Sequence, residues 1–251
     1  MANRRVPEVV AHRGDPVHHR ENTLPAIIQA RQDGARMIEV DVRETSNGIP
    51  VLLHDAETAR LWGRDLPVHE QTHAQVAELF HEGMGVGIPT LEDALRAAGP
   101  ARLLLDFPDP RAVPAAIVTV ARAVQHDGAV LPAFTGDVEA MRAVRAADPD
   151  AEIWLTWTTG LPIDDEVLAS VRPDSWNPPH EQITAESAAQ ARARGLAVTC
   201  WTVNDVGTAR TLAALGVDAI ISDRAADIRK ALVEDARTCT GDDRTAEAPT
   251  S

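Results

Sequence analysis

The feature that most constrains the fold of this chain is a regular alternation of short apolar runs with helical segments, starting at residue 9. Each run has the length of a buried strand and is followed by a pattern typical of a helix. The runs begin near residues 9, 37, 102, 130, 152, 175, 197 and 218. Eight such βα units in 251 residues predict an α/β fold, a TIM (β/α)8 barrel.

The alternation is interrupted once, over about residues 42–89, which we interpret as an insertion after the second strand. Thr72 and Gln75 have the spacing of a capping box and predict a short helix there. Three glycines near its end follow no strand and predict a flexible loop rather than a phosphate cradle: Gly83, Gly85 and Gly87. We therefore expect a single barrel domain over residues 1–233, followed by a polar, Thr-rich and disordered tail over residues 234–251.

Composition limits the partners that this chain can have. Its hydrophobic content of 44% is ordinary for a globular protein, and its net charge of −14 disfavours nucleic acid and anionic membranes. No apolar run is long enough to span a bilayer, and the first residues lack the apolar core of a secretory signal. Two cysteines, Cys200 and Cys239, are too few for a disulfide framework. These features predict a cytoplasmic protein, and they leave the oligomeric state open.

The second predicted strand carries two acids inside an apolar run, at Glu39 and Asp41. Strand side chains alternate in direction, so both carboxylates point to the same face. Such a pair is costly to bury unless a cation lies between its members. Asn47-Gly48 then predicts a two-residue hairpin turn, which would place Asp41 opposite His54.

In a TIM barrel the active site lies at the carboxyl ends of the strands. The polar and aromatic residues predicted there are His12, Arg13, Glu39, Asp41, Asp106, Asn177, Trp201 and Asn204. The three acids among them are hard oxygen ligands that suit Mg²⁺ or Ca²⁺. His12 and His54 are able to act as general base and general acid, and Arg13 to hold an anionic oxygen. Together these groups suit the cleavage of a phosphodiester.

The chain also resembles the glycerophosphodiester phosphodiesterases, within the PLC-like phosphodiesterase superfamily. The resemblance extends over roughly residues 9–227 and lies in an ordered set of short motifs: Ala11-His12-Arg13-Gly14, Glu21-Asn22-Thr23, Ile38 to Val42, Asn47-Gly48, His54-Asp55, Pro89 to Glu92, Trp201 to Asn204 and Val217 to Asp223. It implies a TIM barrel with an insertion after the second strand. It also implies His12 and His54 as the catalytic pair, Glu39 and Asp41 as metal ligands, Arg13 as a phosphate contact and Trp201 as part of the substrate pocket.

The chain departs from the family pattern on the third barrel strand. The family usually carries Glu-x-Lys there, a metal ligand and a phosphate-binding lysine, whereas this chain has Asp106-Phe107-Pro108. Aspartate is still able to bind a metal, as in the similar sphingomyelinase D-like enzymes, but proline cannot replace the lysine. The only lysine of the chain is Lys230, near the C-terminus.

We therefore predict a metal-dependent hydrolase of a glycerophosphodiester or a related small phosphodiester, with Glu39, Asp41 and Asp106 as metal ligands. Two alternatives stay open at this point. A substrate hydroxyl in place of water as the nucleophile would make the chain a lyase that releases a cyclic phosphate. Loss of turnover, which the missing lysine favours, would leave a barrel that only binds phosphorylated ligands.

Overall fold

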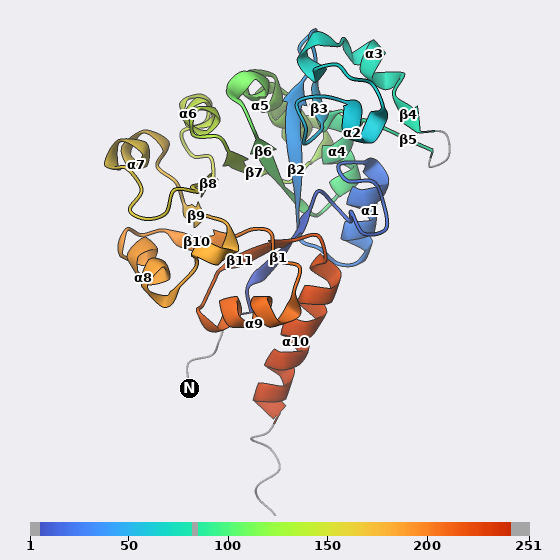
Figure 1. Ribbon diagram of the computed structural model, residues 1–251. Coiled ribbons are helices and arrows are strands. Elements are labelled where there is room, and N and C mark those ends of the chain that lie inside the picture. Colours follow the sequence, from blue (N-terminus) through green and yellow to red (C-terminus); the bar gives the residue numbers. More distant parts are fainter. Residues whose placement is uncertain (1–5, 82–84, 242–251) are drawn as a thin grey trace, which may run out of the picture.

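A closed barrel of eight parallel strands forms the centre of the computed structural model, which describes residues 6–81 and 85–241 (Figure 1). The strands are β1 Glu8–His12, β2 Met37–Glu44, β6 Arg102–Phe107, β7 Ala133–Gly136, β8 Ile153–Thr156, β9 Ser175–Asn177, β10 Ala197–Cys200 and β11 Ala219–Ser222. Their order is β1-β11-β10-β9-β8-β7-β6-β2, and the pairing of β1 with β2 closes the ring. The TIM-barrel prediction is confirmed.

Side chains of the barrel strands alternate between the barrel interior and the surrounding helices, as the pleat of a strand requires. In β2 the outward side chains join the large core beneath the helices: Ile38, Val40 and Val42. The first inward side chain, Met37, packs in an apolar cluster that also contains Leu104 of β6. The next two inward positions of β2 are Glu39 and Asp41. The same alternation that builds the core therefore brings both acids into the barrel.

Helices cover the outside of the barrel (Figure 1). They are α1 Leu24–Gln32, α4 Leu91–Ala98, α5 Val113–Arg122, α6 Val138–Ala147, α7 Asp165–Val171, α8 Ala185–Ala193, α9 Val206–Ala214 and α10 Ala225–Gly241, with short turns η2 Pro110–Ala112, η3 Ala123–Asp127 and η4 His180–Gln182. Thr90 caps α4 and accepts a hydrogen bond from the Asp93 amide. Thr23 precedes α1 in the same way, but its hydroxyl donates to the Arg20 carbonyl and does not cap the helix.

The predicted insertion lies between β2 and α4, at the upper right of Figure 1. It consists of β3 Pro50–Leu52, α2 Ala59–Trp62, η1 Val68–Glu70, α3 His73–Ala77, β4 Phe80–His81 and β5 Val86–Gly87. The capping box of Thr72 and Gln75 is present at the start of α3. The insertion has an apolar core of its own: Val51, Leu53, Val68, Val76, Leu79 and Ile88. Gly87 lies in β5 rather than in a loop, and Gly83 falls outside the described residues.

The hairpin between β2 and β3 differs from the prediction by one residue. Val42 pairs with Leu52 and Glu44 with Pro50, and the Leu53 amide donates to the Asp41 carbonyl, so Asp41 lies opposite Leu53 and not opposite His54. A two-residue turn of the expected type needs positive φ at both central residues. Only Gly48 has it, with φ of 78°. The loop therefore contains one more residue, and the Asn47 side chain accepts a hydrogen bond from the His73 amide of α3.

One barrel strand begins later than its sequence pattern indicates. The fourth strand was expected to begin near residue 130, but β7 begins at Ala133. Pro132 has no amide hydrogen to donate to a ladder, and Leu131 before it is exposed.

The C-terminal region is helical where disorder was expected. α10 continues to Gly241, so the predicted boundary at Glu234 falls inside this helix. Arg210 of α9 makes a bidentate ion pair with Asp235, which attaches this part of α10 to the barrel. The tail prediction is wrong for residues 234–241, and residues 242–251 lie outside the described range.

Within residues 6–81 and 85–241, no helix combines the length and apolarity needed to cross a membrane.

Candidate active site

A cavity of about 540 Å³ lies at the carboxyl ends of the barrel strands. Its lining has a charged half, which comes from β1, β2, β6 and the insertion: His12, Arg13, Glu39, Asp41, His54 and Asp106. The other half, here called the aromatic half, comes from β7 to β10 and their loops. Its lining includes Thr135, Thr156, Trp157, Asn177 and Trp201, together with the charged residue Asp137 at the N-cap of α6. The structure thus brings together all seven residues that the sequence singled out for catalysis, metal binding and substrate contact. Their chemical roles stay predictions.

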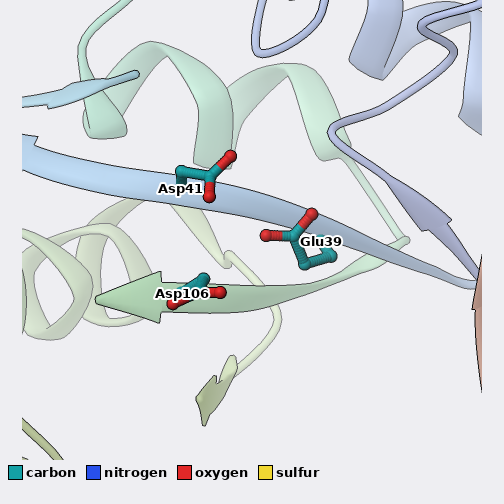
Figure 2. A group of neighbouring side chains, drawn as sticks. All are labelled: Glu39, Asp41 and Asp106. Carbon is teal, nitrogen blue, oxygen red and sulfur yellow. The ribbon is translucent and has the colours of Figure 1, made fainter. Parts of the chain in front are cut away.

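The charged half contains a cluster of three carboxyl groups, from Glu39, Asp41 and Asp106. Each offers an oxygen within 4.8 Å of the other two, and Figure 2 shows the three groups converging from the neighbouring strands β2 and β6. Burial, followed by the negative charge of Asp41, raises the pKa of Glu39 well above its usual value. The same two causes raise the pKa of Asp106 to about 7. Three acids in one buried place therefore require a positive charge before all can ionise.

The cluster fits a divalent cation. Oxygen Oε1 of Glu39 is buried and has no hydrogen-bond partner, although a buried carboxylate oxygen normally has one. The donor set consists of carboxylate oxygens alone, which hard cations such as Mg²⁺ and Ca²⁺ prefer over softer metals.

Two neighbours from the β1–α1 loop hold the acids in place. Asn22 makes a two-way hydrogen bond with Asp41, donating from Nδ2 to Oδ2 at 2.7 Å and accepting from the Asp41 amide at 3.1 Å. The Arg13 amide donates to Glu39 Oε2, and the Arg13 Nε lies 3.2 Å from Asp41 Oδ2. Burial opposes the charge of Arg13, but the nearby acids, Asp41 first, outweigh burial and raise its pKa. Arg13 is therefore a permanent cation in the cavity wall.

His12 has a carboxylate partner that the sequence did not reveal. Its Nδ1 lies 2.6 Å from Asp223 Oδ1, and its Nε2 lies 3.7 Å from Glu39 Oε2. Burial alone would raise the pKa of Asp223, but the hydrogen bond and charge of His12, together with Asn204 and Arg13, outweigh burial and lower it. Asn204 donates to the other oxygen of this carboxylate at 2.6 Å. An ionised Asp223 thus orients the His12 ring and leaves Nε2 facing the cavity.

His54 reaches the same cavity from the insertion, although the register argument that predicted this was wrong. Its ring is 45% exposed, against 17% for His12, and its Nδ1 lies 2.8 Å from Asp55 Oδ1. Arg60 bonds to Asp55, and this hydrogen bond is the largest cause of the lowered pKa of that carboxyl. Arg60 also bonds to Glu21, which in turn accepts from Arg13. An ion-pair chain therefore connects the two sides of the charged half.

Gly136 at the end of β7 is a further requirement of the site that the sequence did not indicate. Its φ is 124°, and a Cβ added there would lie 2.2 Å from the Phe107 carbonyl and 2.7 Å from Asp106 Oδ1. Only glycine leaves room for the Asp106 carboxyl at this position. The residue is recognisable only once the packing of β6 on β7 is known.

The aromatic half has two tryptophans in its wall. Trp201 and Trp157 both line the cavity, and the Trp201 indole donates to the Asn177 carbonyl. Pro108 lines the cavity next to Asp106, where the family pattern has a lysine. Lys230 lies on α10 and does not line this cavity.

Ionisable side chains collected in a cavity at the carboxyl ends of barrel strands define an enzyme of the TIM-barrel class. The chain belongs to the glycerophosphoryl diester phosphodiesterase family, whose model matches residues 12–227. It is thus a phosphoric diester hydrolase.

Individual proteins similar to this chain carry names of the same family. A Mycobacterium tuberculosis protein named probable glycerophosphodiester phosphodiesterase 2 is 29% identical over 84% of this chain and 85% of its own length. A glycerophosphodiester phosphodiesterase of Caldanaerobacter subterraneus is 26% identical over 86% of this chain and 93% of its own. Among solved structures, an Oleispira antarctica phosphodiesterase in complex with its product sn-glycerol-3-phosphate superposes with a TM-score of 0.80, at 23% identity, over 91% of this chain and 97% of its own.

Proposed function

We propose that this protein hydrolyses a glycerophosphodiester with the help of one divalent cation held by Glu39, Asp41 and Asp106. The observation that carries the proposal is the convergence of these three carboxyl groups with the rings of His12 and His54 in one cavity. When bound, the cation neutralises negative charge that develops on the phosphoryl oxygens.

Side chains of the protein bind the phosphoryl group and transfer the protons. Arg13 holds a phosphoryl oxygen through its guanidinium, which keeps its charge at every relevant pH. Water attacks phosphorus, and its proton passes to one of the two imidazoles, His12 or His54. As the bond from phosphorus to the leaving oxygen breaks, the other imidazole protonates that oxygen. Asp223 and Asp55 lie within hydrogen-bond distance of Nδ1 of their respective histidines and orient the two rings.

The two halves of the cavity suggest how the substrate lies. The phosphate belongs with the charged half, and the aromatic half with Trp157 and Trp201 accommodates the alcohol groups that phosphorus joins. The product sn-glycerol-3-phosphate of the Oleispira antarctica relative supports a phosphate monoester of this size as a product here.

Product analysis tests this function directly. We expect turnover of glycerophosphodiesters in ¹⁸O-labelled water to yield a monoester that carries ¹⁸O on phosphorus, detected by phosphorus NMR. An unlabelled cyclic phosphate would show that a substrate hydroxyl attacks instead, as in a lyase. Binding of glycerol 3-phosphate without any turnover would show a barrel that has lost catalysis.

Metal binding should strengthen as pH rises. The raised pKa of Asp106, about 7, means that a cation must displace a proton at lower pH, whereas at higher pH the proton has already left. We expect the increase in Tm that a fixed concentration of Mg²⁺ or Ca²⁺ produces to grow from about pH 6 to about pH 8. In Asp106→Asn this pH dependence should flatten. An equal increase in Tm at both pH values in the unmodified protein would contradict the proposed ligand set.

The missing lysine gives a paired prediction about the phosphate site. Arg13→Lys should lower kcat/KM by about 10², because a point charge cannot replace the bidentate guanidinium. Pro108→Lys should raise kcat/KM on simple glycerophosphodiesters by supplying a second cation. Steady-state kinetics of both variants, with metal binding as the check on folding, measures this. A folded, metal-binding Pro108→Lys variant with no gain would indicate that the natural substrate fills this space with a group of its own.

A further inference from the structure

Arg43 occupies the next inward position of β2 after Glu39 and Asp41, and nothing in the mechanism above uses it. Its side chain is only 13% exposed. All of its recorded bonds go to the protein: Nε and Nη2 both donate to the His54 carbonyl, at 2.9 and 2.6 Å, and Nη1 donates to Asp109 Oδ2 at 3.2 Å. All three guanidinium nitrogens therefore bond to the protein, and Arg43 is not among the residues that line the cavity.

The two partners of Arg43 belong to different parts of the molecule. β3 ends at Leu52, and the last ladder bond joins the Leu53 amide to the Asp41 carbonyl, so His54 lies beyond the hairpin. Asp109 begins η2 in the loop directly after β6, the strand that carries Asp106. Arg43 therefore attaches the backbone of His54 in the insertion to the barrel loop beside the acidic cluster.

Placing the charged guanidinium of Arg43 at this partly buried position costs desolvation energy. Burial lowers the pKa of Arg43, and the negative charges of Asp109, Asp41, Asp55 and Asp106 work against this lowering. Arginine stays protonated even so, because its ordinary pKa is far above neutrality. An uncharged side chain would avoid this desolvation, but it would not provide two parallel donors to one carbonyl oxygen together with a third to Asp109.

We infer that Arg43 is a positioning residue, which fixes the backbone of His54 so that its ring faces the reacting group. The inference rests on the proposed function, in which His54 transfers a proton. Proton transfer requires hydrogen-bond reach, and a misplacement of about 1 Å is enough to cost about 10² in rate. The His54 ring is half exposed and bonded to Asp55, so its place in the cavity depends strongly on where its backbone is held.

The test compares Arg43→Gln with unmodified protein at saturating metal. We expect kcat to fall by about 10–10², because the ring is misplaced in the Michaelis complex. KM should change by less than about threefold, because Arg43 does not touch the substrate in this proposal. Arg43→Lys should recover part of the loss, since one donor can still reach the carbonyl. Asp109→Asn keeps a cap on η2 and removes only the charge partner, so it offers a milder version of the same change if Arg43→Gln folds poorly.

A double-mutant cycle decides whether the effect passes through His54. In a His54→Ala background, Arg43→Gln should lower kcat no further, because the group that it positions is gone. Arg102→Gln is the matched control, because Arg102 likewise donates to two backbone carbonyls and a carboxylate but lies at the opposite end of β6. This control should leave kcat unchanged.

Each outcome separates the inference from the function on which it rests. If Arg43→Gln costs as much in the His54→Ala background as in the unmodified protein, Arg43 acts elsewhere and the inference is wrong, while the proposed function stands. The inference is likewise wrong if Arg43→Gln folds, binds metal and keeps full kcat. If His54→Ala alone leaves kcat unchanged, the role of His54 in the proposed mechanism is wrong, and the inference about Arg43 is wrong with it.

Discussion

Replacing His12 or His54 by alanine is expected to lower kcat on a glycerophosphodiester by about 10²–10⁴ for each residue. The two rings line one cavity, and each is paired with its own carboxylate, Asp223 or Asp55. Because both rings serve one reaction coordinate, the double variant should lose much less than the product of the two single losses. Steady-state kinetics at saturating metal measures this, and His69→Ala is a control at a half-exposed histidine of the insertion that lies outside the cavity.

The histidine prediction has a clear contrary result. If His54→Ala keeps nearly full turnover, the two-histidine mechanism has to be abandoned for this chain. If the two single losses multiply, the histidines act in separate steps.

The second large effect is expected from Glu39→Gln, which removes one carboxylate from the acidic cluster. Loss of the cation should cost about 4 kcal/mol of transition-state stabilisation, a factor of about 10³ in kcat/KM. Without added metal, the same variant should be more stable than the unmodified protein. Its neutral side chain relieves the repulsion and desolvation that raise the pKa of Glu39.

If Glu39→Gln lowers activity and raises stability, Glu39 is a metal ligand. A buried carboxylate that only stabilises the fold would lose stability when it is replaced. Steady-state kinetics measures the activity, and thermal unfolding in chelator and in Mg²⁺ measures the stability. Glu152→Gln is a suitable control, since Glu152 pairs with Arg102 away from the cavity. A Glu39→Gln variant that loses stability in chelator and keeps its metal response would show that Glu39 is a structural residue and not a ligand.

Several features of the site could be predicted from the sequence because they depend on local pattern. Strand alternation alone places Glu39 and Asp41 on one face of β2, and the structure confirms it. Eight βα units imply a barrel, and the barrel rule then brings residues from β1, β2 and β6 to one end. The capping threonine of α4 was likewise visible in the sequence, since a cap depends on residues within one turn.

The hairpin register was not decided by local pattern. Two-residue and three-residue loops are both common for an Asn-Gly sequence, so a small energy difference chooses between them. In this chain the choice involves a residue outside the hairpin, because the Asn47 side chain accepts from the His73 amide in α3. His54 still reaches the cavity, because the chain leaves the ladder after Leu53 and Arg43 holds the His54 carbonyl.

The sequence by itself thus determined the fold class, the insertion and the type of residue that lines the cavity. Tertiary structure alone decided the partners that orient those residues. Asp223 meets His12 across 211 positions of sequence because β11 pairs with β1 to close the barrel. Arg43 meets Asp109 because the β6–α5 loop lies over the end of β2. Contacts of this kind depend on which strands lie side by side in the barrel, and no periodicity within one element encodes them.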